Sequence, residues 1–236
     1  MSNTLQNIFL MRHAESAGNA DLNIHKQLPD HAIGLTAKGW NQAANAGLEF
    51  SDFIRRKYQL PDQSVRIWCS PYLRTIQTCD SFLSGIDTPT LPIFKDFRTN
   101  IMLAEQDFGL FDGREPDEIK SQFPVEHAHF QKHIDQKGKF YARPPMGESR
   151  FDVAVRIHGF FGTIWRDAEK SKNPTGNIFV VSHGATIRAF VMMWLHKNPE
   201  WFDTEKNPRN ASIRHIGRDE NGQWKDMGYI FKGFSR

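Results

Sequence analysis

The sequence is poor in the features that mark secreted, disulfide-bonded and membrane-spanning proteins. It holds only two cysteines in 236 residues, Cys69 and Cys79, so we expect small core residues rather than a disulfide framework. No apolar run approaches the ~18 residues that a membrane-spanning helix needs. Residues 1–7 contain no basic residue and no long apolar stretch, unlike a signal peptide. We therefore expect a cytoplasmic protein with no membrane partner.

Several ligand-binding motifs are also missing. There is no Walker phosphate loop, no G-x-G-x-x-G fingerprint and no H-E-x-x-H sequence, which leaves nucleotide-cofactor and zinc-protease chemistry unsupported. The formal net charge of +3 is too small to favour nucleic acid as a partner, although a modest positive excess fits an anion pocket. His127, His129 and His133 lack the spacing of a common metal site, so we predict no metal and no cofactor.

What is present fits a single globular α/β domain covering residues 1–236. Apolar strand-like runs occur at 7–11, 65–69, 92–94 and 177–182, and they alternate with expected helices at 36–57, 71–83, 148–167 and 185–196. In the third helix Phe151, Val155, Ile157, Phe161 and Ile164 approximate one apolar face. Such alternation predicts a mainly parallel sheet with helices on both faces.

Two other segments complete the expected architecture. Strand-like runs at 211–218 and 223–231 are joined by a turn containing Asn221-Gly222, which indicates a hairpin at the edge of the sheet. The segment from about 98 to 143 breaks the alternation and is rich in charged, histidine and aromatic residues. We interpret it as an inserted cap over the carboxyl edge of the sheet, where loops usually set specificity.

Polar residues that suit an anion follow three of the expected strands. Arg12-His13 comes directly after the first strand, and Ser182-His183-Gly184 ends a later one. Arg74 follows the second strand, in Ser70-Pro71-Tyr72-Leu73-Arg74-Thr75, where serine and proline predict the start of a helix. Arginine near a helix N-terminus favours an anion, and ligands of open α/β sheets bind at the carboxyl ends of strands.

The ordered set of motifs resembles the histidine phosphatase superfamily, also called the phosphoglycerate mutase-like family, over nearly the whole chain. The resemblance rests on Leu10-Met11-Arg12-His13-Ala14-Glu15-Ser16 with Asn19, on Ser70-Pro71-Tyr72-Leu73-Arg74-Thr75 with Gln77-Thr78, and on Ser182-His183-Gly184. Weaker matches lie at 34–43, 105–109 and 145–149. Ala14 stands where the family most often has glycine, and since it is also small we expect little effect.

The resemblance implies a metal-independent enzyme that cleaves phosphomonoesters. His13 would be the nucleophile that becomes phosphorylated, while Arg12, Arg74, His183 and Asn19 would bind the phosphoryl oxygens. The ring nitrogen of His13 that does not attack phosphorus should donate a hydrogen bond to a backbone carbonyl, which fixes the tautomer of the ring. Glu105 resembles the proton donor of the family and is favoured over Asp107, the nearest other carboxylate in the segment.

Three functions stay open at this point. A phosphatase acting on a small phosphorylated substrate, with phosphate as product, is favoured because Gln106-Asp107-Phe108-Gly109 looks like the broad-range phosphatase branch. The cofactor-dependent mutases of the family carry an arginine-histidine-tyrosine run there instead. A mutase that passes the phosphoryl group to a second hydroxyl is the alternative, and a non-catalytic phosphate-binding module is the third.

Overall fold

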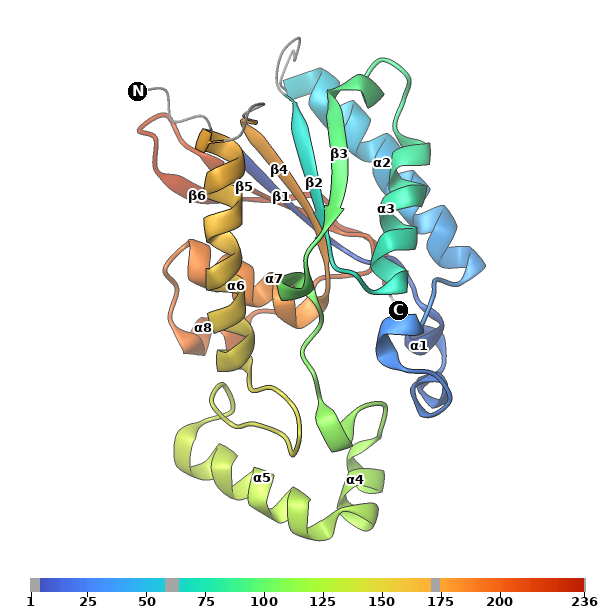
Figure 1. Ribbon diagram of the computed structural model, residues 1–236, viewed down its shortest axis with the longest axis vertical. Coiled ribbons are helices and arrows are strands. Elements are labelled where there is room, and N and C mark those ends of the chain that lie inside the picture. The colour runs from blue at the N-terminus through green and yellow to red at the C-terminus, as the bar shows by residue number, and fades with distance from the viewer. Residues whose placement is uncertain (1–4, 58–63, 171–174, 236) are drawn as a thin grey trace.

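The computed structural model describes residues 5–57, 64–170 and 175–235 (Figure 1). Its strands are β1 (Asn7–Arg12), β2 (Val65–Cys69), β3 (Phe94–Thr99), β4 (Asn177–Ser182), β5 (Ile213–Arg218) and β6 (Trp224–Phe231). Its helices are α1 (Ala17–Ala20), α2 (Ala37–Lys57), α3 (Leu73–Gly85), α4 (Pro116–Gln122), α5 (Pro124–Lys137), α6 (Arg150–Trp165), α7 (Gly184–Trp194) and α8 (Pro199–Thr204). Short 3₁₀ turns lie between several of them.

The described strands form one sheet of six in the order β3-β2-β4-β1-β5-β6. β3, β2, β4 and β1 pair in parallel, while β5 runs antiparallel to both β1 and β6. The predicted α/β fold with a mainly parallel sheet is thus confirmed. The predicted terminal hairpin is also confirmed, and it extends the sheet beyond β1.

Each face of the sheet carries its own hydrophobic core. Ile8 and Leu10 of β1 pack on the face that α6 and α7 cover. Phe9 and Met11, which point the other way because strand side chains alternate, pack with α2 and α3. Figure 1 shows these two helix pairs on opposite sides of the sheet. Both faces are covered, which explains why the central strands are apolar throughout rather than alternating.

Strand register brings the polar motifs to one edge of the sheet. Arg12 pairs with Ser182, and Val181 pairs with Cys69. The residues that follow these strands, including His13 and His183, therefore leave the sheet side by side. Both predicted core cysteines, Cys69 and Cys79, are buried and unpaired by disulfide, and burial raises the pKa of Cys79 to about 12.

Two of the predicted boundaries that shift lie next to a proline, and proline explains the first of them. The strand expected at 92–94 lies later, at Phe94–Thr99, because Pro92 lies in a 3₁₀ turn over Leu91–Ile93 and has no N–H for a sheet ladder. The helix expected from residue 71 begins at Leu73, with Tyr72 as its N-cap. Arg74 is therefore the second residue of α3.

The expected apolar face of α6 is only partly correct. Ile157, Phe161 and Ile164 are buried as predicted, but Phe151 and Val155 are about half exposed. The buried face also includes Val153, Ala154 and Phe160. Near the helix start Phe151 packs instead on the ring of Tyr141, with ring centroids 5.7 Å apart. Which residues of α6 are buried therefore depends on the elements that pack against the helix and not on hydrophobicity alone.

The first two residues of the segment predicted as an insertion belong to the sheet instead. Arg98 and Thr99 complete β3, and α4 and α5 follow. Proline occupies the first turn of each of these helices, where its missing N–H costs no hydrogen bond. Figure 1 shows α4 and α5 beyond the carboxyl ends of the parallel strands. Within the described ranges, no helix combines the length and hydropathy needed to cross a membrane.

Candidate active site

His13 lies at the carboxyl end of β1 with a defined tautomer. Its backbone N–H donates to the carbonyl of Ser182 at 2.9 Å, which continues the β1–β4 ladder by one residue. Its ring Nδ1 lies 2.8 Å from the carbonyl oxygen of Ala14. A carbonyl only accepts, so Nδ1 carries the proton and Nε2 carries the lone pair of the neutral ring. This is the carbonyl contact that the sequence analysis expected.

Two buried arginines border the same cavity as His13. The cavity has a volume of about 310 Å³, and its walls include Arg12, His13, Asn19, Arg74 and Glu105. Arg12 donates from Nη1 to the carbonyl of Pro208 at 2.6 Å. Five of the six predicted site residues are therefore brought to one cavity, although they come from three widely separated parts of the chain.

Arg74 is held by a residue that the sequence analysis missed. Its Nη1 donates to the backbone carbonyl of Asp30 at 2.6 Å and lies 2.9 Å from the Oδ1 of Asp30. Its Nη2 donates to Oδ2 at 3.0 Å. The ring of Tyr72 lies 5.0 Å from the guanidinium carbon. These contacts leave the Nε–H and one Nη2–H as a fork on the opposite edge of the guanidinium, suited to an anion.

His183 lies next to His13 but does not line the cavity. It is the N-cap residue of α7 and is fully buried, with its ring centroid 5.2 Å from that of His13. Its Nε2 lies 2.8 Å from the hydroxyl of Ser70. Burial, followed by the charge of Arg74, holds the pKa of His183 well below its usual range. The ring is therefore neutral at pH 7.

Asn19 is oriented by two hydrogen bonds to its carbonyl oxygen. Oδ1 accepts from the backbone N–H of Ser16 at 3.3 Å, which completes a capping box at α1. It also accepts from the Nδ2 of Asn210 at 2.9 Å. The contacts among the described residues thus use the oxygen and leave the Nδ2 donors of Asn19 available toward the cavity that it lines.

Glu105 lies where the N-terminus of α7 meets the cavity. Its Oε2 accepts from the backbone N–H of Gly184, and its Oε1 from that of Gln106, each at 3.0 Å. The positive end of a helix favours a carboxylate at this place. A Cβ at position 184 would lie 2.2 Å from Oδ1 of the exposed Asn207, so a larger residue there would have to displace that side chain. The Ser-His-Gly motif therefore supplies a donor to Glu105 as well as a histidine.

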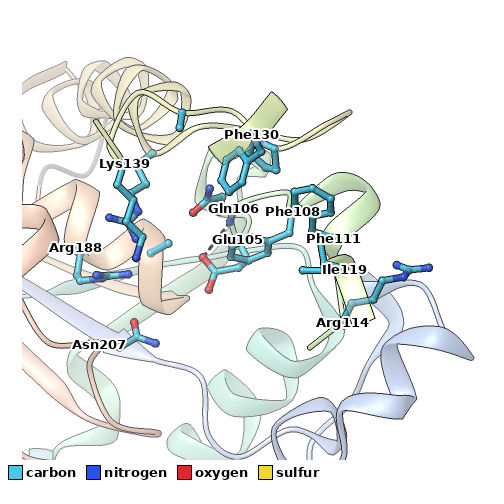
Figure 2. A pocket seen from close by; sticks show the side chains of 14 residues that line it. Glu105, Gln106, Phe108, Phe111, Arg114, Ile119, Phe130, Lys139, Arg188 and Asn207 are labelled. Carbon is cyan, nitrogen blue, oxygen red and sulfur yellow. Dashed lines mark hydrogen bonds between the residues drawn. The ribbon is translucent and has the colours of Figure 1, made fainter. Parts of the chain in front are cut away.

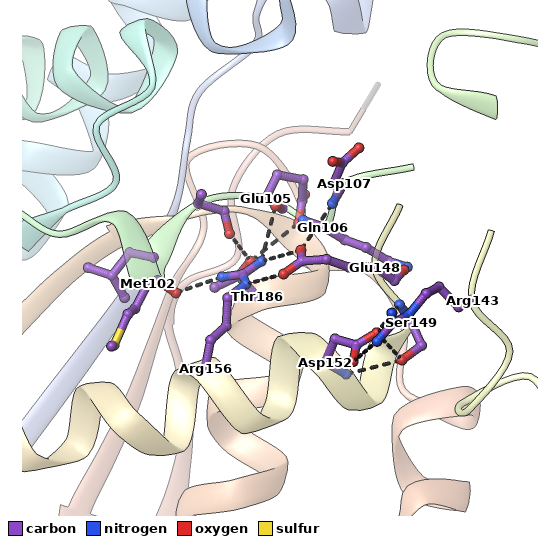
Figure 3. Close-up of polar contacts among 12 residues, drawn as sticks. Met102, Glu105, Gln106, Asp107, Arg143, Glu148, Ser149, Asp152, Arg156 and Thr186 are labelled. Atoms are coloured by element: carbon purple, nitrogen blue, oxygen red, sulfur yellow. Dashed lines mark hydrogen bonds and ion pairs between the residues drawn. The ribbon is translucent and has the colours of Figure 1, made fainter. Parts of the chain in front are cut away.

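A network from α6 fixes the backbone that carries Glu105 (Figure 3). Arg156 donates to the carbonyls of Met102 and Glu105, at 2.6 and 3.0 Å. It also pairs through two nitrogens with Glu148, at 2.8 and 3.1 Å. Glu148 in turn accepts from the backbone N–H of Asp107 at 3.1 Å. The sequence analysis placed Glu148 in a supporting motif but did not identify Arg156.

Asp107 stabilises a turn and, unlike Glu105, does not line the cavity. Its Oδ1 accepts from the N–H of Gly109 at 2.7 Å, within the same turn. Gly109 has a positive φ of 57°, and a Cβ there would lie 2.1 Å from the carbonyl of Pro145. Glycine is required at this turn for both reasons. Asp107 is not among the residues that line the cavity with His13.

The residues that the sequence analysis missed hold other residues of the site in place through hydrogen bonds. Asn210 is 98% buried, and its Nδ2 also lies 3.2 Å from the carbonyl of His13. Asp30 and Pro208 belong to turns with no chemical motif of their own. The only available signals were an aspartate before a short turn and an Asn-Pro-Arg-Asn run. Neither is specific.

The described residues contain one group of three side chains close enough to share a metal ion. His25, Asp30 and Asp112 offer ligand atoms within 4.8 Å of one another. Their contacts are also those of an ordinary charge cluster, since hydrogen bonding to Asp112 raises the pKa of His25. His129 and His133 on α5 do not belong to such a group within the described ranges.

Comparison with known proteins identifies the class that this fold and site define. The model of the histidine phosphatase superfamily (branch 1) matches residues 8–227. The chain belongs to this superfamily. It is 32% identical over 222 residues to the phosphoglycerate mutase-like protein AT74 of Arabidopsis thaliana, covering 92% of this chain and 66% of that protein. It is 24% identical to the broad-range acid phosphatase DET1 of Saccharomyces cerevisiae, covering 91% of this chain and 86% of that one.

Solved structures share the fold over nearly their whole length. A mycobacterial glucosyl-3-phosphoglycerate phosphatase aligns with a TM-score of 0.69 at 17% identity, covering 96% of this chain and 99% of the other. The α-ribazole phosphatase of Shigella flexneri aligns with a TM-score of 0.68 at 17% identity, covering 98% of each chain. The phosphoglycerate mutase-like fold is thereby confirmed.

Proposed function

We propose that this protein is a phosphatase that hydrolyses small phosphomonoesters through a phosphohistidine on Nε2 of His13. One observation carries the proposal. The Nδ1–H of His13 is bound to the carbonyl of Ala14, so Nε2 has the lone pair, in a cavity that two arginines also line. A neutral nucleophile beside fixed positive charge is what attack on a phosphate dianion requires.

In the first step Nε2 of His13 attacks phosphorus as the bond from phosphorus to the alcohol oxygen breaks. Arg12, Arg74 and the Nδ2 of Asn19 donate to the phosphoryl oxygens, with the neutral ring of His183 beside them. Glu105, in its protonated form, transfers a proton to the leaving oxygen. Its position on the cavity wall, unlike that of Asp107, supports this role.

In the second step water attacks the phosphorus of phosphohistidine. The carboxylate of Glu105 takes a proton from that water, the bond from phosphorus to Nε2 breaks, and inorganic phosphate leaves. Glu105 is then protonated again and His13 is neutral, so the cycle closes. Arginines supply the positive charge in both steps, and therefore the mechanism needs no metal ion. The segment at 100–143 acts in this proposal as a cap that shapes the space for the alcohol.

Rapid-quench labelling tests the proposal. With a ³²P-labelled phosphomonoester, label that is stable to alkali and labile to acid should accumulate on the protein. His13→Ala should lose both the label and phosphate release, whereas His158→Ala, on an exposed position of α6, should keep both. Label on serine or aspartate, or near-normal turnover by His13→Ala, would reject the mechanism.

Product analysis separates hydrolysis from the other two candidate functions. Release of inorganic phosphate in equal amount to the alcohol supports the phosphatase. Conversion of a phosphoglycerate to its isomer, with little phosphate released, would indicate a mutase that uses the same intermediate. Binding of phosphate without turnover of any phosphomonoester would leave only a phosphate-binding module.

A further inference from the structure

A second cavity of about 430 Å³ adjoins the candidate active site (Figure 2). The two cavities share Glu105, Phe108, Phe111, Arg114 and Asn207 in their walls. In the proposed mechanism Glu105 protonates the leaving oxygen. The space beyond Glu105 is therefore the space into which the alcohol part of the substrate extends.

The walls of this second cavity are strongly positive. Four basic residues line it: Arg114, Lys139, Arg150 and Arg188. The only acidic residue among its lining residues is Glu105. Figure 2 shows Lys139 and Arg188 on one side of Glu105, with Phe108 and Phe111 on the other. The alcohol part of a substrate, if it were neutral, would form no ion pair with these basic residues.

The guanidinium of Arg188 is poorly satisfied by the protein. Its Nη1 reaches the carbonyls of Phe202 and Glu205 only at 3.3 and 3.4 Å. Its Nε is buried and has no hydrogen-bond partner among the described residues. The ring of Phe202 packs against it at 4.4 Å, which fixes its plane. Burial lowers the pKa of Arg188, although the charges of Glu105 and Glu205 oppose that change.

Arg150 strengthens the field around Arg188. It packs on the same Phe202 ring, with its guanidinium carbon 5.1 Å from the centroid, and pairs with Asp203. Burial and the charge of Arg188 lower the pKa of Arg150 to about 10. Two partly buried guanidinium groups thus pack on one aromatic ring and repel each other. An anion bound in the cavity that both residues line would relieve this repulsion.

We propose that the second cavity binds a second anionic group of the substrate, a phosphate or a carboxylate, through Arg188 and Lys139. The inference rests on the proposed function and specifies its substrate class: phosphomonoesters whose alcohol part itself bears an anion. Glu105 then lies between the two anions, next to the oxygen it protonates. Phe111 and Phe130, whose ring centroids lie 5.5 Å apart, form the apolar wall against the carbon skeleton.

Matched substrates test this subsite. In one pair 3-phosphoglycerate is compared with glycerol 3-phosphate, which replaces the carboxylate by a hydroxymethyl group. In the other pair propane-1,3-diol bisphosphate is compared with 3-hydroxypropyl phosphate. The charged member of at least one pair should have the higher kcat/KM by about tenfold or more, since a hydrogen bond to a charged group has this worth. The pair that responds tells whether a carboxylate or a phosphate is preferred.

Substitutions of residues in the second cavity test whether this cavity causes the preference for substrates with a second anion. Arg188→Met and Lys139→Ala should each reduce the charged-to-uncharged ratio several-fold, and Arg188→Lys should retain part of it. Lys139 is exposed, so its replacement cannot act by unfolding the core. Arg166→Met, which removes an exposed charge at the end of α6, should leave the ratio unchanged. Ratios near one in both pairs, or ratios that neither Arg188→Met nor Lys139→Ala reduces, would overturn the inference.

Failure of the proposed function can be distinguished from failure of the subsite. If none of the four matched phosphomonoesters and not even p-nitrophenyl phosphate releases phosphate, the phosphatase proposal fails. Calorimetric binding of propane-1,3-diol bisphosphate and 3-hydroxypropyl phosphate then decides the subsite alone. Tighter binding of the bisphosphate that Arg188→Met weakens supports the subsite, and equal binding of the two compounds rejects it.

Discussion

The carboxylate and the backbone carbonyl of Asp30 together take three contacts from the guanidinium of Arg74, at 2.6 to 3.0 Å. An arginine that is expected to bind phosphate is therefore already paired with an anion of its own chain. The pairing uses Nη1 and one hydrogen of Nη2, and among these contacts it leaves the Nε–H and the other Nη2–H of an arginine that lines the cavity. We interpret Asp30 as a positioning residue for Arg74.

Asp30→Asn should lower kcat for phosphomonoester hydrolysis by about tenfold, because an arginine that is free to turn no longer presents a fixed fork. Steady-state kinetics and inhibition by inorganic phosphate measure the effect. Asp52→Asn is the matched control, since Asp52 is an ion-paired aspartate on α2 that does not line the cavity. Tighter phosphate inhibition with unchanged kcat in Asp30→Asn would mean that Asp30 competes with substrate instead.

Arg74→Lys should reduce kcat/KM strongly even though the charge is retained. A lysine offers a point charge and cannot keep both the contact to Asp30 and a planar fork for two phosphoryl oxygens. Loss of one such donor costs on the order of 10²–10³ in kcat. Activity equal to that of the native protein would make Arg74 a structural residue.

Glu105→Gln should affect substrates according to their leaving groups. Single-turnover phosphorylation of His13 by an alkyl phosphate should slow greatly, because a poor leaving group needs the proton as the bond breaks. Phosphorylation by p-nitrophenyl phosphate should slow much less, since nitrophenolate leaves without help. An equal loss with both substrates would argue against Glu105, and Asp107→Asn would be the next variant to measure.

The burial of His183 should make the protein less stable in acid. An unfolded histidine titrates near pH 6.5, whereas the fold holds the pKa of His183 well below that value. As the pH falls below about 6.5, the unfolded chain binds a proton that the folded chain does not. The free energy of unfolding should therefore fall by up to about 1.4 kcal/mol per pH unit from this group, and the contribution is fully present above that pH.

Urea unfolding between pH 5 and pH 7.5 measures this dependence. His183→Gln should show a shallower loss of stability in acid than the native protein. His158→Gln, at an exposed position of α6, should keep the native slope. The same slope in His183→Gln and the native protein would mean that the fold does not keep this ring neutral.

Activity should survive exhaustive treatment with EDTA. The reason is that Arg12 and Arg74 line the cavity with His13 and supply its positive charge. Phosphate release before and after chelation, with and without added Mg²⁺, measures the requirement. Loss of activity that a divalent ion restores would favour a metal-bound water over phosphohistidine, with His25, Asp30 and Asp112 as the ligands to replace first.

The sequence by itself determined the strands other than β3, the four helices α2, α3, α6 and α7, and the motif residues, because these depend on local signals. Apolar runs gave β1, β2 and β4, and Asn221-Gly222 gave the hairpin of β5 and β6. The place of His13 at a strand end also followed from its neighbours in the chain. The predictions failed where a local signal had two readings, as with Pro71, which precedes α3 instead of opening it.

Only the tertiary structure decided what surrounds those motifs. Asp30 and Arg74 are 44 positions apart, and Asn19 and Asn210 are 191 apart, so no pattern along the chain links them. Strand register set His13 beside His183, and the packing of α6 set Arg156 against Glu105. The cavity at Arg188 exists because 139–150, α7 and the turn at Asn207 converge there. Such contacts depend on how distant elements pack, and side-chain type alone does not reveal that.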